Sequence, residues 1–301
     1  MEIYLPIAEM PINILLLLMA GFGAGILSGL FGIGGGFIMT PLLIFMGVPP
    51  TVSVASSANQ IIASSFSGFI THARRRNVDF KMGYILIIGG FIGSSLGIMI
   101  FKWLKSFGQI DLVISLSYII ILGSIGLSMG VESVRSVLNI KAVKKDFSRK
   151  DKLFASLPFK VKFPRSKLEI SLIIPITVSI LAGMLVSIMG IGGGFIMIPA
   201  MIYIIGMPTS IVVGTSLFQV IFITSNVTIL HAITTNSVDI ILAGILLASS
   251  VVGAQFGTRL GVYFPADKLR VLLAFMVLAV VFRLTYGFLV EPTNPFEVIV
   301  F

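Results

Sequence analysis

Residues 32–41, Gly-Ile-Gly-Gly-Gly-Phe-Ile-Met-Thr-Pro, return 158 positions later as residues 190–199, Gly-Ile-Gly-Gly-Gly-Phe-Ile-Met-Ile-Pro. Nine of the ten positions are identical. Both copies place a run of glycines inside apolar sequence, where an unbroken helix would be the ordinary way to cross a membrane. The repetition indicates an internal duplication in which each half contributes one discontinuous membrane helix.

The composition places the chain in a lipid bilayer. Only 21 basic and 12 acidic residues occur among 301, and the mean hydropathy is +1.09, whereas about 25% of a soluble domain is charged. Stretches after the glycine runs, 37–47 and 195–206, are too short to span. Stretches of about one span length lie near 12–30, 52–70, 82–101, 112–130, 169–188, 209–230, 240–260 and 269–290.

The sequence therefore predicts an all-α polytopic membrane protein built from two homologous repeats, whose broken, re-entrant helices meet near the bilayer midplane. The first transmembrane repeat is predicted to span 1–130 and the second 169–301, with a basic linker at 131–168. The chain has no cysteine, which excludes disulfides, thiolate metal sites and thiol nucleophiles. We expect neither a metal nor a cofactor.

Charge predicts the orientation. The linker carries eleven Lys/Arg and three acidic residues, which indicates a cytoplasmic segment next to anionic lipid. No aromatic-interleaved or zinc-binding motif accompanies these charges, so we expect no nucleic-acid partner. If each glycine-containing segment is a hairpin and the repeats are inverted, eighteen Lys/Arg lie inside and two outside; parallel repeats give fifteen against five. Inversion is favoured, and the parallel arrangement stays open.

The glycine runs suggest a binding site for an anion. Non-helical backbone at membrane depth must face protein or water, and glycine lets bare amides approach a ligand. Helices are expected to begin at Phe37 and Phe195, directly after the runs, with their amide ends turned toward the glycines. Two such ends near the midplane would attract an oxyanion without any charged side chain. Alternatively, the glycines serve only a tight turn and close packing.

A polar stripe supports a lined path. On the stretch 50–71 the polar residues recur at gaps of 4, 3, 4, 3 and 4, one face of a helix. Gln60 and its counterpart Gln219 each place an amide at mid-span, which must face a helix, water or substrate. Hydrogen bonding between the two repeats is the alternative. The predicted substrate-binding residues are Gly34, Gly35, Gly36, Phe37, Ser57, Asn59, Gln60, Gly192, Gly193, Gly194, Phe195, Thr215, Ser216 and Gln219.

Other polar residues suggest structural roles. Asp79 and Asp239 open their predicted spans, as helix N-caps do. His72 and His231 stand at span ends, where an interfacial position is favoured over a gate or proton site. Arg283 is expected to extend toward the lipid headgroups rather than to contact substrate.

The sequence resembles the sulfite exporter family TauE/SafE in three features. These are the doubled glycine element, the prolines that follow it at Pro49 and Pro208, and the Ser/Thr-x-x-x-Gln motifs within predicted helices, whose last residues are Gln60 and Gln219. The resemblance covers roughly 15–130 and 172–288. It implies a plasma-membrane permease for small sulfur-containing anions, such as sulfite and organosulfonates, working by export or exchange.

No nucleotide-binding motif is present, so transport would be secondary, with H+ or Na+ as the candidate coupling ion. The alternatives are an intramembrane enzyme and a membrane scaffold subunit. An enzyme is disfavoured because the sequence has no rhomboid-type Gly-x-Ser-Gly motif and no paired intramembrane aspartates, and no catalytic residue is predicted. A scaffold would explain the small-residue motifs but not two glycine breaks.

Overall fold

The computed structural model describes residues 2–137, 158–261, 263 and 266–289. Most of the predicted linker, 138–157, and the acidic tail residues Glu291 and Glu297 lie outside this part of the chain. The described residues are mainly helical, which confirms an all-α polytopic membrane protein. The helices are α1 (Ile14–Phe31), α2 (Gly36–Phe45), α3 (Pro50–Arg74), α4 (Phe80–Ser106), α5 (Ile110–Val137), α7 (Ile173–Met189), α8 (Gly194–Ala200), α9 (Thr209–Thr234), α10 (Ile240–Leu260) and α11 (Ala266–Leu289).

Each of the eight predicted spans coincides with one of these helices. Five helices in the described residues are long and apolar enough to cross a membrane: α1, α4, α5, α9 and α10. Helix α3 has the same length as these but carries the polar stripe, which lowers its hydropathy. A π-helical turn, η1 (Met201–Ile205), extends α8 just after Pro199, where the ring removes a helical hydrogen bond.

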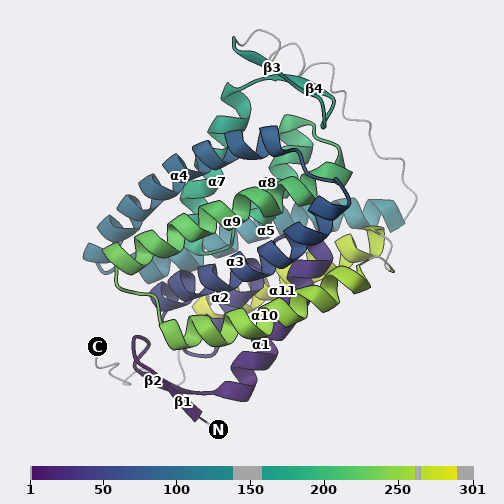
Figure 1. The fold of residues 1–301 in the computed structure, drawn as a ribbon. Helices are drawn as coiled ribbons and strands as arrows, with labels where there is room; N and C mark the ends of the chain where they lie inside the picture. The colour runs from purple at the N-terminus through teal and green to yellow at the C-terminus, as the bar shows by residue number, and fades with distance from the viewer. Residues whose placement is uncertain (1, 138–157, 262, 264–265, 290–301) are drawn as a thin grey trace. The chain divides into compact units, whose positions relative to one another are not determined.

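The described helices form two compact units. Almost all of α5 pairs with α11 in the smaller unit, where a Cβ added to Gly126 would lie 2.9 Å from the Val277 side chain. The remaining elements form the larger unit, which contains both glycine runs (Figure 1).

Stripes of small residues join helices from different halves of the chain within the larger unit. Gly25 of α1 faces the backbone of Ser250 in α10, and Gly183 of α7 faces Gly90 in α4. At Gly183 an added Cβ would lie 2.6 Å from the Gly90 carbonyl oxygen. Helix backbones can approach this closely only where side chains are absent or very small. The contacts advance in the same direction along both partners, so α1 runs parallel to α10 and α4 parallel to α7.

Helices α3 and α9 pack against each other in opposite directions (Figure 1). Ser56, near the start of α3, accepts a hydrogen bond from the amide of Asp239, just beyond the end of α9 (3.0 Å). Near the other end of α3, the His72 Cβ lies 3.0 Å from the Cβ position of Gly214, at the start of α9. The amide of Asp79 correspondingly donates to Thr215 of α9 at 2.9 Å.

Both aspartates are buried helix N-caps, as the sequence predicts. Asp79 accepts the Met82 amide at 3.1 Å, and Asp239 accepts the amides of Ile241 and Leu242. Each carboxylate has a second function. Asp79 accepts a 2.5 Å bond from the Ser166 hydroxyl and Asp239 a 3.0 Å bond from the Ile7 amide, so each cap holds the turn of a β-hairpin.

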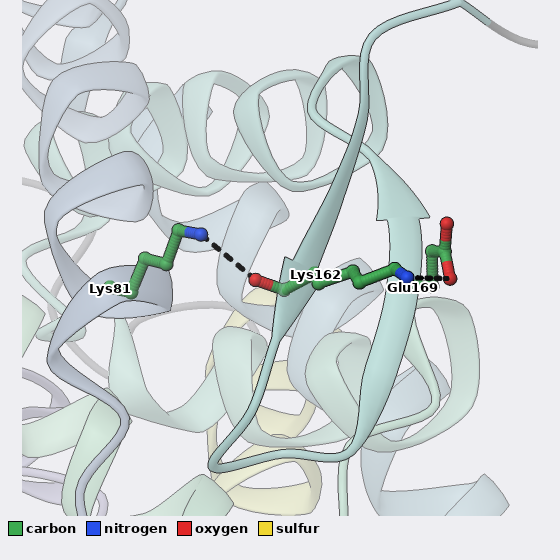
Figure 2. Close-up of polar contacts among 3 residues, drawn as sticks. All are labelled: Lys81, Lys162 and Glu169. Carbon is green, nitrogen blue, oxygen red and sulfur yellow. Dashed lines mark hydrogen bonds and ion pairs between the residues drawn. The ribbon is translucent and has the colours of Figure 1, made fainter.

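Those hairpins are absent from the sequence prediction. Strands β1 (Glu2–Leu5) and β2 (Met10–Asn13) pair antiparallel, as do β3 (Lys160–Phe163) and β4 (Leu168–Ser171). Figure 2 shows the second hairpin tied to α4: Lys81 donates to the Lys162 carbonyl oxygen at 2.9 Å. The Lys162–Glu169 ion pair in the same view is long, at 3.8 Å, and solvent-exposed, so it contributes little stability.

The hairpins lie at opposite ends of the larger unit (Figure 1). At the β3–β4 end, Arg165 also donates to the Arg76 carbonyl oxygen at 2.7 Å. At the β1–β2 end, Lys105 donates to the Thr235 carbonyl oxygen and the Ser237 hydroxyl, both at 3.2 Å. The loops after α4 and after α9 therefore share one end, and the loop after α3 is at the other.

Candidate functional site

The two glycine runs meet inside the larger unit. Gly32 caps the end of α1 and Gly190 the end of α7, both in the left-handed conformation, and α2 and α8 begin a few residues later. A Cβ added to Gly36 would lie 2.8 Å from the Gly190 carbonyl oxygen. One added to Gly194 would lie 2.5 Å from the Ile33 carbonyl oxygen. Each run thus packs backbone to backbone against the other.

Phe37 and Phe195 complete this contact. Their rings stack with centroids 5.0 Å apart and planes 14° apart, and both side chains are almost fully buried. Such a pair contributes about 0.5–1.5 kcal/mol beyond the area that it buries. Five of the predicted residues therefore lie together: Gly34, Gly36, Phe37, Gly194 and Phe195. Gly192 is beside them, because its carbonyl oxygen lies 3.5 Å from the Cβ position of Gly34.

The loop before α2 requires glycine and leads directly into a helix N-terminus. Gly35, the residue before α2, has φ +74°, in the left-handed region that glycine adopts without strain. The amides of Ile38 and Met39 both donate to the Gly35 carbonyl oxygen at 3.3 Å, which leaves those of Gly36 and Phe37 without a carbonyl of a preceding helical turn. The positive dipole end of the ten-residue helix lies at the same place. Helix α8, of seven residues, begins at the corresponding place in the second half.

Gln60 and Gln219 are the most unusual polar groups of the larger unit. Both side chains are 0% exposed, and neither the amide nitrogen nor the amide oxygen of either has a hydrogen-bond partner in the described residues. The Gln60 Nε2 lies 3.3 Å from the Cβ position of Gly35, next to the glycine loop. Leaving such a group unpaired costs about 1–3 kcal/mol, so a polar ligand is a natural partner.

The remaining predicted residues are engaged by the protein or lie apart. Ser57 bonds to Thr40 at 2.7 Å and Ser216 to the Val213 carbonyl oxygen at 2.9 Å. Thr215 holds the Asp79 amide. Asn59 is half-buried, with its Nδ2 unpartnered in the described residues. At Gly193, φ is +50°, and the Cβ position is bordered by methyl groups of Val186 and Val220.

The histidines differ from each other. His231 is fully buried, and its ring nitrogens lie 3.0 Å from the Ser187 carbonyl oxygen and 3.2 Å from the Thr235 hydroxyl. It is therefore part of the packing between α9 and α7. His72 is half-buried near the end of α3.

Sequence reasoning missed two serines beside the first glycine loop. Ser28 of α1 is 1% exposed and Ser65 of α3 is 0% exposed, and neither hydroxyl has a partner in the described residues. The Ser65 Oγ lies 3.2 Å from the Cβ position of Gly34, and the Ser28 Cβ lies 3.2 Å from that of Gly35. An alignment of the two repeats could have identified Ser28, because the matching position in the second half is the apolar Val186. The two halves therefore differ in polarity at this position.

One end of the polar stripe opens at the surface. A groove of about 870 Å³ lies between α3 and α10, near the β3–β4 end. Stripe residues Ser67 and Thr71 line it together with the three arginines Arg74, Arg75 and Arg259, and none of the described residues that line it is acidic. Ser64, one turn earlier on α3, donates to the Gly34 carbonyl oxygen at 3.1 Å, which links the stripe to the glycine loop.

Comparison with known proteins agrees with this architecture. The family model "Sulfite exporter TauE/SafE" matches residues 17–284. The chain is 28% identical to "Probable membrane transporter protein YjnA" of Bacillus subtilis (strain 168), over 87% of this chain and 96% of that one. It is also 28% identical to "Probable membrane transporter protein YunE" of the same organism, over 83% and 87%. No solved structure gives a significant match.

A shorter match reaches a plant protein. This chain is 29% identical to "Sulfite exporter TauE/SafE family protein 5" of Arabidopsis thaliana, over 31% of this chain and 21% of that one. The family model covers most of the chain, including both glycine runs, Gln60 and Gln219. This chain is therefore a multi-pass membrane transporter that belongs to the sulfite exporter TauE/SafE family.

Proposed function

We propose that the protein is a plasma-membrane permease for small sulfur oxyanions, sulfite or organosulfonates, and that it works by secondary transport. The observation that carries the proposal is the pair of buried, unpartnered amides of Gln60 and Gln219 in the half-chains whose glycine loops meet. Amide N–H groups and loop amides donate hydrogen bonds to an anion but carry no fixed charge that would hold it too tightly for release. No catalytic residue is assigned, and a coupled ion would be H+ or Na+.

We further propose that the two halves are inverted repeats. The order hairpin, helix, short helix and long helices occurs twice, and the equivalent helices α3 and α9 run antiparallel. The hairpins lie at opposite ends of the larger unit (Figure 1). The loop after α4 and the loop after α9 share an end through Lys105, whereas parallel repeats would separate them. Inverted repeats around one site are a common basis for alternating access.

Reconstituted flux tests the function. Proteoliposomes containing the purified chain should move labelled sulfite or methanesulfonate down an imposed gradient, and an H+ or Na+ gradient should drive accumulation if either ion is coupled. Protein-free liposomes provide the background. Movement of neither anion by a well-folded preparation would contradict the proposed substrate class. It would leave the scaffold and enzyme alternatives.

Cysteine labelling tests the orientation, because the chain contains no cysteine of its own. The β3–β4 end bears Arg74, Arg75, Arg76 and the basic hairpin, so we place it and the linker in the cytoplasm. In intact cells an impermeant maleimide should label Gln109→Cys, at the β1–β2 end, and should label Lys160→Cys only after permeabilisation. Both positions are exposed. The reverse pattern would place the linker outside.

A further inference from the structure

We propose that the oxyanion is bound asymmetrically, by the first glycine loop, and that the hydroxyls of Ser28 and Ser65 are binding groups alongside the Gln60 amide. This inference rests on the proposed function and deepens it. It assigns a binding role to two residues of one half and denies that role to their counterparts in the other half.

Three unpartnered polar side chains surround two consecutive residues of the first loop. Ser28 and Gln60 border Gly35, with the Ser28 Cβ at 3.2 Å and the Gln60 Nε2 at 3.3 Å from its Cβ position. Ser65 borders Gly34, with its Oγ at 3.2 Å. All three are at most 1% exposed, and within the described residues none of the three makes a side-chain hydrogen bond.

Buried hydroxyls and amides in proteins nearly always have a hydrogen-bond partner. Because three exceptions lie around one loop, we infer that a single bound ligand is the partner of all three. The loop leads into α2, whose ten residues direct their amide dipoles toward the same three side chains. A hydroxyl, an NH₂ group and a backbone amide can each donate a hydrogen bond; the hydroxyls and the Gln60 Oε1 can also accept, but the positive end of α2 favours a negatively charged partner. Their common partner is therefore an acceptor with several oxygens, such as a sulfite or sulfonate group.

The second loop lacks these groups. Val186 occupies the position of Ser28, and a Val186 methyl carbon lies 3.3 Å from the Cβ position of Gly193. Thr224 occupies the position of Ser65, but its hydroxyl donates to the Val220 carbonyl oxygen of its own helix at 2.6 Å. Of the three counterparts, only Gln219 has a side chain without a hydrogen-bond partner in the described residues. The anion therefore lies against the first loop, and the second loop mainly packs.

The matching positions provide the test. Ser28→Val gives α1 the residue that α7 has at the matching position. Ser65→Ala removes the other hydroxyl, and Ser28→Ala serves if valine prevents folding. In the full chain in lipid nanodiscs, each should weaken sulfite and methanesulfonate binding about 10-fold or more, the effect of losing a hydrogen bond to a charged ligand. The melting temperature should stay unchanged or rise. Thr224→Val, the matched control, should leave both dissociation constants unchanged.

Other outcomes separate the two claims. If the wild-type protein binds the anions and the serine variants bind them equally well, the asymmetric site is wrong and the proposed function stands. If the serine variants alter only the response to Na+, the hydroxyls bind a cation and the assignment is again wrong. If the wild-type protein binds neither anion, the proposed substrate class fails and this assignment fails with it.

Discussion

Gly35→Val is expected to abolish anion transport and to lower the melting temperature, because two independent constraints exclude a side chain at this position. At φ +74° a β-branched residue is strained by its own backbone. A Cβ would also lie 2.7 Å from the Ala24 carbonyl oxygen, which belongs to helix α1 and cannot move aside without the helix. A larger side chain would in addition press on Gln60, one of the proposed binding groups.

Two comparisons make this result interpretable. Gly23→Val inserts the same side chain into α1 at a point with no neighbour within 4 Å, so it should leave flux and abundance close to wild type. Gly193→Val should also stop transport, yet more folded protein should remain, because its neighbours are side-chain methyl groups at 3.3–3.4 Å rather than backbone. Flux per folded molecule would be measured in proteoliposomes. Normal flux through Gly35→Val would exclude the glycine loop as a substrate contact.

Gln60→Leu and Gln219→Leu are each expected to weaken sulfite binding by about 10- to 150-fold, the loss of one hydrogen bond to a charged ligand at about 1.5–3 kcal/mol. The structure also predicts the sign of the stability change. Since neither amide has a partner in the described residues, replacing it with an apolar side chain of similar volume removes a buried unpaired group. The melting temperature of each variant should therefore hold or rise.

Thr215→Val is the control with the opposite pattern. The Thr215 hydroxyl accepts the Asp79 amide at the start of α4, so its loss should lower the melting temperature and leave sulfite affinity close to wild type. Unchanged affinity with a marked loss of melting temperature in the glutamine variants would instead assign both amides to packing between the repeats. The site would then consist of backbone amides alone.

The helices and the places where they break can be predicted from the amino-acid sequence. Spans are long, apolar and local, and every backbone group in them is satisfied within its own segment, so composition along the chain is enough to find them. The N-caps at Asp79 and Asp239 were equally readable, because a cap acts on amides two or three residues away. The duplicated glycine run likewise predicted where a helix must stop, and α1 and α7 end there.

What those breaks contact depends on how the helices pack in three dimensions. The β-hairpins could not be predicted from the sequence, because four-residue strands are not stable alone. They are held by hydrogen bonds to distant residues, such as the bond from the Ile7 amide to the Asp239 carboxylate, 232 positions away. In the sequence, Ser28 does not differ from the other small residues of its helix, and only the fold brings it next to Gly35 and Gln60. Periodicity describes one element at a time, whereas a binding site depends on polar groups from separate helices that remain unpaired after packing, and packing across the whole chain determines which groups those are.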